Sequence, residues 1–262
     1  GKSEILTGSI QSIILINQTA YLLLTEVGLQ VIDVSDPIHP SALGMLEING
    51  ANAVTIVNDY AYVTTGYSCI TNLEEDITCQ GDLHIINVSN PSNPIEAGSV
   101  NIYGWGSSIV VLNTYAYVVA GNGENFKEGL RVVNISDPIN PELVRALELE
   151  NIYGSNVAVI MSNNYAFVVG DAYLWVIDIN NLSNPKVTTS YLIGDNYTDV
   201  AQADNYLYVL SEFCELGQCS RIIRAVDVSD PEDPLYVQTN ANGSGEGVGR
   251  QFVVLNGIIY QS

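Results

Sequence analysis

Five copies of one short pattern recur along the chain, and this repeat constrains the fold more than any other feature of the sequence. Each copy is an apolar run that ends at an Asp or Asn anchor, and a proline follows the anchor seven residues later. The anchors, 44 to 54 residues apart, are Asp33, Asn87, Asn134, Asp178 and Asp227. A period of this length predicts an array of equivalent structural units.

Proline is confined to these copies, which read LQVIDVSDPIHP, LHIINVSNPSNP, LRVVNISDPINP, LWVIDINNLSNP and IRAVDVSDPEDP. The chain has 9 prolines, and all lie here: Pro37, Pro40, Pro91, Pro94, Pro138, Pro141, Pro185, Pro231 and Pro234. An Asp or Asn before a proline can accept a hydrogen bond from a backbone N–H two residues on, while the proline fixes φ. The pattern predicts a rigid corner between two antiparallel strands. Only the fourth copy departs from it, with Leu182 in place of the first proline.

Each corner lies among four apolar segments rich in β-forming residues, and no segment has a helical period. In the third segment of the first unit, Leu29 and Val31 lie on one face and Ile32 and Val34 on the other. A strand that is apolar on both faces fits a sheet packed between two other sheets. We therefore predict an all-β, six-bladed β-propeller with four-stranded antiparallel blades.

The blade count rests on five full units and two partial ones. Residues 249–262 supply the first two strands of a sixth blade, and residues 3–10 resemble a fourth strand. This predicts one domain, 1–262, whose last blade is shared between the two termini. The third strand of that blade is missing, so either the chain continues past Ser262 or a neighbouring molecule donates a strand. The residues that would take part in strand donation are Glu4, Ile5, Leu6 and Ile10.

Charge and cysteine content restrict the partners and the compartment. The net charge is -21, from 29 acidic and 8 basic residues, which argues against nucleic acid and anionic lipid as partners. No apolar run is long enough for membrane insertion. The 4 cysteines fall in two polar insertions, which favours the disulfides Cys69–Cys79 and Cys214–Cys219 over a zinc site. We therefore expect a secreted protein, extracellular or at the cell surface.

The five quoted strands and their VSDPxxP corners resemble the LVIVD-repeat family of β-propellers. The resemblance spans Val31 to Pro234. It implies the propeller fold and a surface or secreted microbial protein of undefined activity.

The strongest candidate binding residues are aromatic. NIYGWG (101–106) and NIYGSN (151–156) occupy equivalent connections, so Tyr103, Trp105, Tyr153 and Tyr197 should cluster near one end of the propeller axis. Aromatic rings beside Asn and Asp suit contacts with sugars or proteins. A second interpretation is that the rings seal gaps between adjacent blades. Arg131 and Arg250 are among the few cations that could anchor a ligand.

Catalytic and metal motifs are weak. The repeated anchors are explained as turn caps, because Asn replaces Asp at two of them and cannot transfer a proton. The acidic insertion with Glu74, Glu75, Asp76 and Asp82 could hold Ca²⁺, but it lacks the spacing of a calcium loop. No nucleophile pairs with His39 or His84. We therefore predict no catalytic residue, no metal ligand and no required cofactor.

The function expected from the sequence is a non-enzymatic binding or structural module. Its partners would be itself, in a homo-oligomer or filament built by strand donation, or other surface proteins and glycans. A glycan-binding, lectin-like propeller is the alternative, and a calcium-dependent hydrolase or lyase ranks last. Of the N-x-S/T sequons, those at Asn17, Asn196 and Asn242 lie in expected turns or loops and are the glycosylation candidates.

Overall fold

The computed structural model of the chain consists of strands and turns, with no helix among the residues that it describes. These residues are 8–66, 68–71, 77–121, 128–150, 157–170, 172–193, 197–215, 218–243, 252–255 and 258–261. Residues 157 and 198–199, and the strand residues within 68–80, 212–221 and 238–261, are described by their backbone alone. The chain divides into two compact units, Gly1–Glu148 and Leu149–Ser262, and each is described by itself.

Unit 1 contains three four-stranded antiparallel sheets and a separate hairpin. The first sheet is β1 (Ile10–Ile16), β2 (Thr19–Leu24), β3 (Gly28–Asp33) and β4 (Ser41–Glu47). The second is β5 (Ala51–Val57), β6 (Tyr60–Thr65), β9 (Asp82–Asn87) and β10 (Ile95–Asn101). The third is β11 (Trp105–Leu112), β12 (Tyr115–Gly121), β13 (Gly129–Asn134) and β14 (Glu142–Glu148). The hairpin, β7 (Ser68–Thr71) with β8 (Ile77–Gln80), is inserted between β6 and β9.

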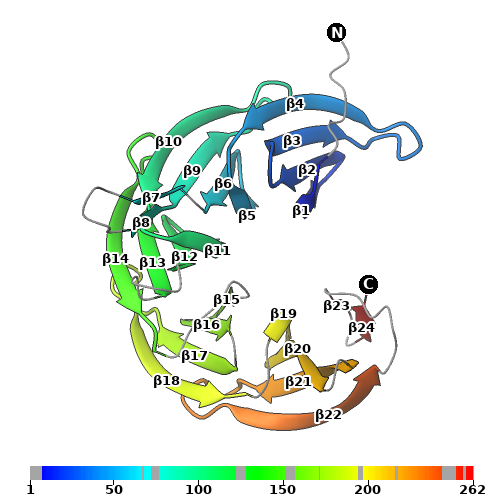
Figure 1. Cartoon of the computed structure of the whole chain (residues 1–262), viewed down its shortest axis with the longest axis vertical. Helices are drawn as coiled ribbons and strands as arrows, with labels where there is room; N and C mark the ends of the chain where they lie inside the picture. The colour runs from blue at the N-terminus through cyan, green and yellow to red at the C-terminus, as the bar shows by residue number, and fades with distance from the viewer. Residues whose placement is uncertain are drawn as a thin grey trace. The chain divides into compact units, whose positions relative to one another are not determined.

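The first strands of the three sheets in unit 1 lie side by side. β1 contacts β5, and β5 contacts β11, while β4, β10 and β14 form the opposite edges of their sheets (Figure 1). One apolar cluster joins the first and second sheets through residues such as Leu29 and Val63. A second cluster joins the second and third sheets through residues such as Leu83 and Val118. Stacking the sheets face to face thus buries their middle strands.

Unit 2 repeats the same arrangement. Its first sheet is β15 (Val157–Ser162), β16 (Tyr165–Gly170), β17 (Tyr173–Asp178) and β18 (Lys186–Leu192). Its second is β19 (Tyr197–Ala203), β20 (Tyr206–Glu215), β21 (Gln218–Asp227) and β22 (Leu235–Gly243). The hairpin of β23 (Phe252–Leu255) and β24 (Ile258–Gln261) follows, with β23 against β19. One apolar cluster, which includes Phe167 and Leu207, joins the two sheets.

The predicted burial of the third strands on both faces is confirmed. In β3, Leu29 and Val31 are 0% exposed and Ile32, on the opposite face, is 5% exposed. β13 has the same burial pattern, and β17 differs from it only at its first residue, Tyr173, which is half-buried. The physical cause is that each of these strands lies in the interior of its sheet, paired on both edges and apolar on both faces.

A two-residue turn joins the first two strands of each four-stranded sheet. Its first residue adopts a left-handed φ of 51 to 55° at all five positions, which are Asn17, Asn58, Asn113, Asn163 and Asp204. Asn and Asp tolerate this backbone region better than other residues with side chains. The repeat therefore places the same type of residue at every such turn.

The anchor of each corner is a turn cap, as predicted. Oδ1 of Asp33 accepts a hydrogen bond from the backbone N–H of Ser35 at 2.8 Å, and the anchors Asn87, Asn134, Asp178 and Asp227 do the same two residues on, at 2.7 to 3.0 Å. The hydrogen bond from Ser35 lowers the pKa of Asp33. The amide oxygen of Asn accepts the same backbone hydrogen bond as the carboxylate oxygen of Asp, which explains why Asn replaces Asp at two anchors.

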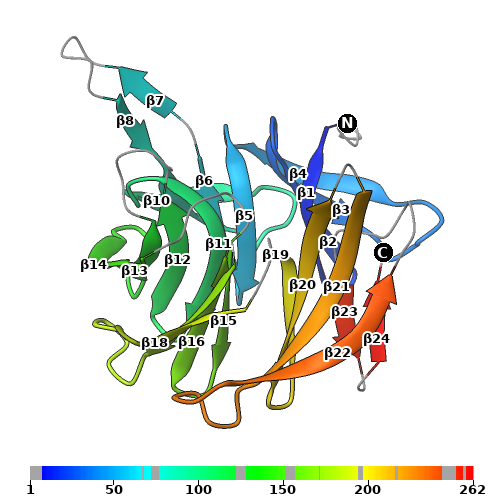
Figure 2. The same cartoon turned by 60° about the horizontal axis from the view of Figure 1, so that its bottom comes forward.

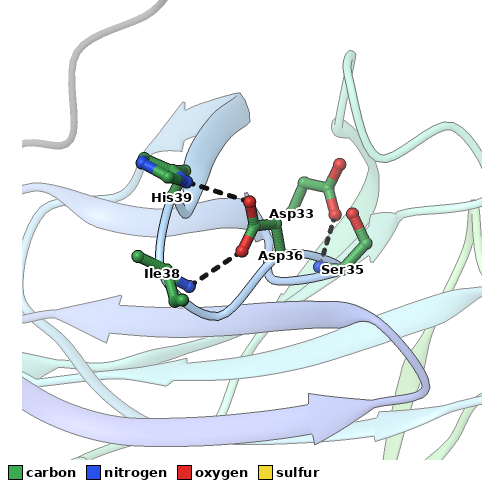
Figure 3. Close-up of polar contacts among 5 residues, drawn as sticks. All are labelled: Asp33, Ser35, Asp36, Ile38 and His39. Atoms are coloured by element: carbon green, nitrogen blue, oxygen red, sulfur yellow. Dashed lines mark hydrogen bonds and ion pairs between the residues drawn. The ribbon is translucent and has the colours of Figure 1, made fainter.

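A second cap completes the corner (Figure 3). Oδ1 of Asp36 accepts from the backbone N–H of Ile38 at 3.0 Å, and the Asp36 carbonyl oxygen accepts from the N–H of His39 at 3.1 Å. Nδ1 of the exposed His39 lies 2.9 Å from Oδ2 of Asp36, a contact that, with the Ile38 N–H, lowers the pKa of Asp36. The fourth corner, without its first proline, still closes by the hydrogen bond from the Asn184 N–H to the Asn181 carbonyl oxygen at 2.9 Å.

In unit 1, the second and third corners also pack against the outer strand of the preceding sheet. A side chain at Gly44, on β4, would lie 2.5 Å from the carbonyl oxygen of Pro91 and 2.8 Å from Pro94. Gly98, on β10, faces the carbonyl oxygens of Pro138 and Ile139 in the same way. The corners are therefore part of the contact between neighbouring sheets.

Five four-stranded antiparallel sheets, each running through its strands in chain order, give an all-β, propeller-like fold. The six-blade count and the closure of the ring through the two termini stay predictions, as does the single domain.

Candidate functional site

The connection between β10 and β11 presents an exposed aromatic ring in unit 1. We call residues 101–106 the Tyr103 loop. Tyr103 is 55% exposed, and its φ of 52° lies in the left-handed region, which costs a non-glycine residue about 1–2 kcal/mol. The Tyr103 N–H donates to Oδ1 of Asn101 at 2.8 Å. A neighbouring side chain thus stabilises the conformation that presents the ring.

A buried arginine fixes the backbone of the same loop. Arg131, on β13, is only 4% exposed. Its Nε donates to the carbonyl oxygen of Ile102 at 3.1 Å, and its Nη2 to that of Tyr103 at 3.5 Å. Burial lowers the pKa of Arg131, and the negative charge of Glu148 opposes part of this effect. Because arginine stays protonated in proteins, these are charge-assisted hydrogen bonds, which are stronger than neutral ones.

The end of the Tyr103 loop is held by the neighbouring sheet. Nδ2 of Asn52, on β5, donates to the carbonyl oxygen of Gly106 at 2.9 Å. The hydroxyl of Thr64, which is fully buried on β6, donates to the same oxygen at 2.7 Å. The loop is therefore bound to two sheets, and moving its backbone would break hydrogen bonds in places that water reaches poorly.

Trp105 is half-buried and lies at the contact between the same two sheets. A side chain on Gly66, just after β6, would fall 2.5 Å from Cδ1 of the Trp105 ring. Gly66 in turn donates its N–H to the carbonyl oxygen of Gly50 at 3.0 Å. The ring thus packs against the backbone of the preceding sheet, so Trp105 offers only part of its surface to a ligand.

Polar side chains lie on the first strands of the three sheets in unit 1. The pairing of β1, β5 and β11 with their neighbours is irregular at Gln11, Asn52 and Ser107. Nε2 of Gln11 lies 3.4 Å from Oδ1 of Asn52. Such bulges change the direction of a side chain and are common near binding sites. Asn52 connects these polar side chains to the Tyr103 loop through its hydrogen bond to the carbonyl oxygen of Gly106.

Of the other two predicted aromatic residues, the structure describes only Tyr197. Tyr197, in unit 2, is 4% exposed and lies in the apolar cluster with Phe167 and Leu207. It is a core residue, with its ring turned away from solvent. Tyr153 lies outside the described residues. Of the four, only Tyr103 presents a largely exposed ring in the described part of the chain.

The other residues named from the sequence have separate locations. Asn17 is exposed at the turn between β1 and β2, and Asn242 lies on β22, where only the backbone is described. Ile10, at the start of β1, is 51% exposed. The predicted residues Glu4, Ile5, Leu6, Asn196, Glu74, Glu75, Asp76 and Arg250 lie outside the described residues.

The two histidines each contact one carboxylate. Nδ1 of His84, on β9, lies 2.8 Å from Oε1 of Glu96, and His39 belongs to the first corner. Among the described residues there is no group of three His, Cys, Asp or Glu side chains that could hold a metal ion. No helix in the described ranges has the length and apolar character to cross a membrane.

The residues that hold the Tyr103 loop are harder to find in the sequence than Tyr103 itself. Asn52, Thr64 and Arg131 lie 28 to 54 residues away from the loop atoms that they bind. Arg131 stands out in the sequence as a rare cation that could contact a ligand, but it is buried and bonds backbone carbonyl oxygens. In the local sequence, only the repeated NIYG motif points to the Tyr103 loop.

Comparisons with solved structures bear on the fold alone, because all identities are low. The computationally designed protein Ika8 is 10% identical with a TM-score of 0.55, over 96% of this chain and 80% of that one. A functionally unknown protein from Desulfotomaculum acetoxidans is 12% identical with a TM-score of 0.50, over 98% and 90%. The periplasmic gluconolactonase PpgL of Pseudomonas aeruginosa is 10% identical with a TM-score of 0.65, over 88% and 70%.

No curated protein matches the chain. The comparison with protein families, in contrast, identifies the family of the chain. The LVIVD repeat matches residues 7–46, 77–102, 104–147 and 153–193, which together make up more than half of the chain. This protein belongs to the LVIVD repeat family.

Proposed function

We propose that this protein is an extracellular, non-enzymatic binding module that holds neutral carbohydrate at the Tyr103 loop. One observation carries the proposal: the Tyr103 ring is 55% exposed, while the backbone that bears it is fixed by Asn101 and Arg131. An exposed ring on a mobile loop would lose conformational entropy when it binds. A ring that is already held in place avoids that cost.

The polar groups on the first strands of unit 1 and the net charge favour a sugar over an anionic ligand. A sugar presents apolar C–H faces that can lie on an aromatic ring and hydroxyl groups that need directed hydrogen bonds. The exposed amide of Gln11 and the half-buried Asn52 and Ser107 provide such groups on the adjacent strands. The net charge of -21 disfavours phosphorylated or sulfated ligands and leaves neutral glycans unaffected.

The test is a screen of neutral glycans, followed by calorimetry on the best ligand with the full chain and with a Tyr103→Ala variant. We expect the affinity to fall at least about tenfold, or about 1.4 kcal/mol, because truncating an exposed central aromatic removes most of its contact area. Tyr103→Phe should retain most of the affinity if the ring face makes the contact.

Tyr236 provides a matched control. It is 54% exposed, on β22 of unit 2, so Tyr236→Ala removes an equally exposed tyrosine without changing the Tyr103 loop. Equal losses of affinity in Tyr103→Ala and Tyr236→Ala, or no binding to any neutral glycan, would contradict the proposal.

An enzymatic function has one point in its favour, the shared fold with a protein named a gluconolactonase. The same preparations can be tested for hydrolysis of sugar lactones, with and without added Ca²⁺. If lactone hydrolysis co-purifies with the protein, its function is catalysis and the binding proposal is wrong.

A second candidate function, self-assembly, is favoured by the first strand of unit 1. β1 is an edge strand of seven residues without a charge, and Ile13 and Leu15 are 60% and 64% exposed. The equivalent residues of the second sheet, Val54 and Ile56, pack against the core cluster that includes the first sheet. We propose that a second copy of the chain covers Ile13 and Leu15 in an oligomer or filament.

Light scattering over a range of concentrations tests this assembly. The mass of the wild-type particle should grow with concentration, and the double variant Ile13→Lys with Leu15→Lys should stay at the mass of one chain. Ile38→Lys, at a corner residue that is 82% exposed, is the control and should assemble like the wild type. A single-chain mass for the wild-type protein at every concentration would rule out assembly through β1.

A further inference from the structure

The β7–β8 hairpin projects from the second sheet of unit 1 (Figure 2), and its base touches the Tyr103 loop. Its two ends join the second sheet at Gly66 and Gly81. The Gly81 carbonyl oxygen accepts from the N–H of Ile102 at 2.8 Å, and a side chain on Gly81 would overlap the carbonyl oxygen of Gly104. At the other end, Gly66 lies against the ring of Trp105. The base of the hairpin is thus in direct contact with the candidate site.

The strand register brings two cysteines together in this hairpin. Cys69 on β7 is paired directly with Cys79 on β8. Residues that are directly opposite in an antiparallel pair have Cα atoms about 4.5 or 5.5 Å apart, and disulfides span Cα distances of about 4.4–6.8 Å. Both values lie in that range, so the spacing of the two strands is compatible with the cross-link.

A hairpin of this kind needs additional support. β7 and β8 form a two-stranded sheet of their own, not hydrogen-bonded to the second sheet. An isolated two-stranded hairpin is at best marginally stable in water. We infer that Cys69 and Cys79 form a cross-strand disulfide that keeps the β7–β8 hairpin folded beside the Tyr103 loop, and that ligand binding at this loop depends on the bond. The second half of this inference rests on the proposed carbohydrate-binding function.

The oxidation is a two-electron reaction. Two thiols lose two protons and two electrons to the disulfide of an exporting cell's thiol oxidoreductase, which is reduced to a dithiol as the S–S bond forms. Such oxidants act in the periplasm and in secretory compartments. This agrees with the extracellular location proposed above.

Unit 2 contains a built-in control. Cys214 and Cys219 are also directly paired, at the tip of the β20–β21 hairpin, which is the same second-to-third-strand connection in a different sheet. The same geometric argument predicts a second disulfide there. Because β20 and β21 belong to a four-stranded sheet, this hairpin has support that β7–β8 lacks, and its cross-link should matter less.

The first measurement is peptide mapping by mass spectrometry of protein from an oxidising compartment, alkylated without reduction. We expect two linked peptide pairs, Cys69 with Cys79 and Cys214 with Cys219. Alkylated Cys69 or Cys79, or a link between the two hairpins, would overturn the assignment. This measurement needs no ligand, so it stands whether or not the protein binds carbohydrate.

The second measurement compares the double variants Cys69→Ser/Cys79→Ser and Cys214→Ser/Cys219→Ser. We expect the first to bind the glycan at least about fivefold more weakly and to change the fluorescence of Trp105, which contacts the base of the hairpin. The second variant should do neither. A Cys69→Ser/Cys79→Ser variant with wild-type affinity and fluorescence would show that the bond is irrelevant to the site, and the fluorescence reports on the hairpin even without a ligand.

Discussion

Replacing Phe167 by alanine is expected to lower the free energy of unfolding by about 3–5 kcal/mol. Phe167, on β16, is 1% exposed and lies in the cluster that joins the two sheets of unit 2. Its neighbours in the cluster come from both sheets and include Leu174 and Val209. Removing the ring leaves a cavity that rigid strands cannot fill, so the lost contacts add to the lost hydrophobic burial. Chemical denaturation followed by circular dichroism measures the change.

Two further variants separate this effect from general damage. Phe167→Leu keeps much of the side-chain volume, so its free energy of unfolding should fall clearly less than that of the alanine variant. Leu192→Ala removes a side chain of the same unit that is 70% exposed and should change the stability by less than about 0.5 kcal/mol. If Phe167→Ala cost no more than Leu192→Ala, the packing of the two sheets described above would be wrong.

The second large effect is expected for Gly81→Ala. A β-carbon at Gly81 would overlap the carbonyl oxygen of Gly104 and lie 2.7 Å from that of Thr65. Both are backbone atoms, and the Gly104 side is fixed through the hydrogen bond from Ile102 to Gly81. We expect a loss of about 1–3 kcal/mol in unfolding free energy, together with weaker ligand binding, because the Tyr103 loop must shift to make room.

Gly8→Ala is the control for this prediction. A β-carbon there would meet its nearest neighbour, Cδ2 of Leu24, at 3.5 Å, which is an ordinary van der Waals distance. The variant should therefore keep the stability and the binding of the wild type. A Gly81→Ala protein that melts and binds like Gly8→Ala would show that the base of the β7–β8 hairpin does not press on the Tyr103 loop.

Sequence reasoning succeeds where the interacting residues are close in the chain. Asp33 caps Ser35 and Asp36 caps Ile38, each across two residues, and both contacts follow from the residue types and their spacing. The turns at Asn17 and its equivalents follow for the same reason, because the left-handed region selects Asn and Asp locally. The alternation of apolar residues in β3 likewise reports burial on both faces.

Sequence reasoning fails where the role of a side chain depends on the residues that pack against it. Tyr103 and Tyr197 stand in similar polar, aromatic connections, yet Tyr103 is 55% exposed and Tyr197 is 4% exposed. The difference comes from the surroundings: Tyr197 meets an apolar cluster that includes Phe167, whereas Tyr103 has a left-handed φ and an exposed ring. Nothing in the local sequence separates the two.

The sequence by itself determined the repeated unit, its four strands and its rigid corners, because a backbone of fixed geometry and side-chain oxygens two residues away are sufficient to build them. Only the tertiary structure decided which aromatic residue faces solvent and what holds it there. The bonds from Arg131 to Ile102 and from Asn52 to Gly106 join residues 29 and 54 positions apart. Such contacts exist only after neighbouring sheets have packed, and the chain carries no local pattern that encodes them.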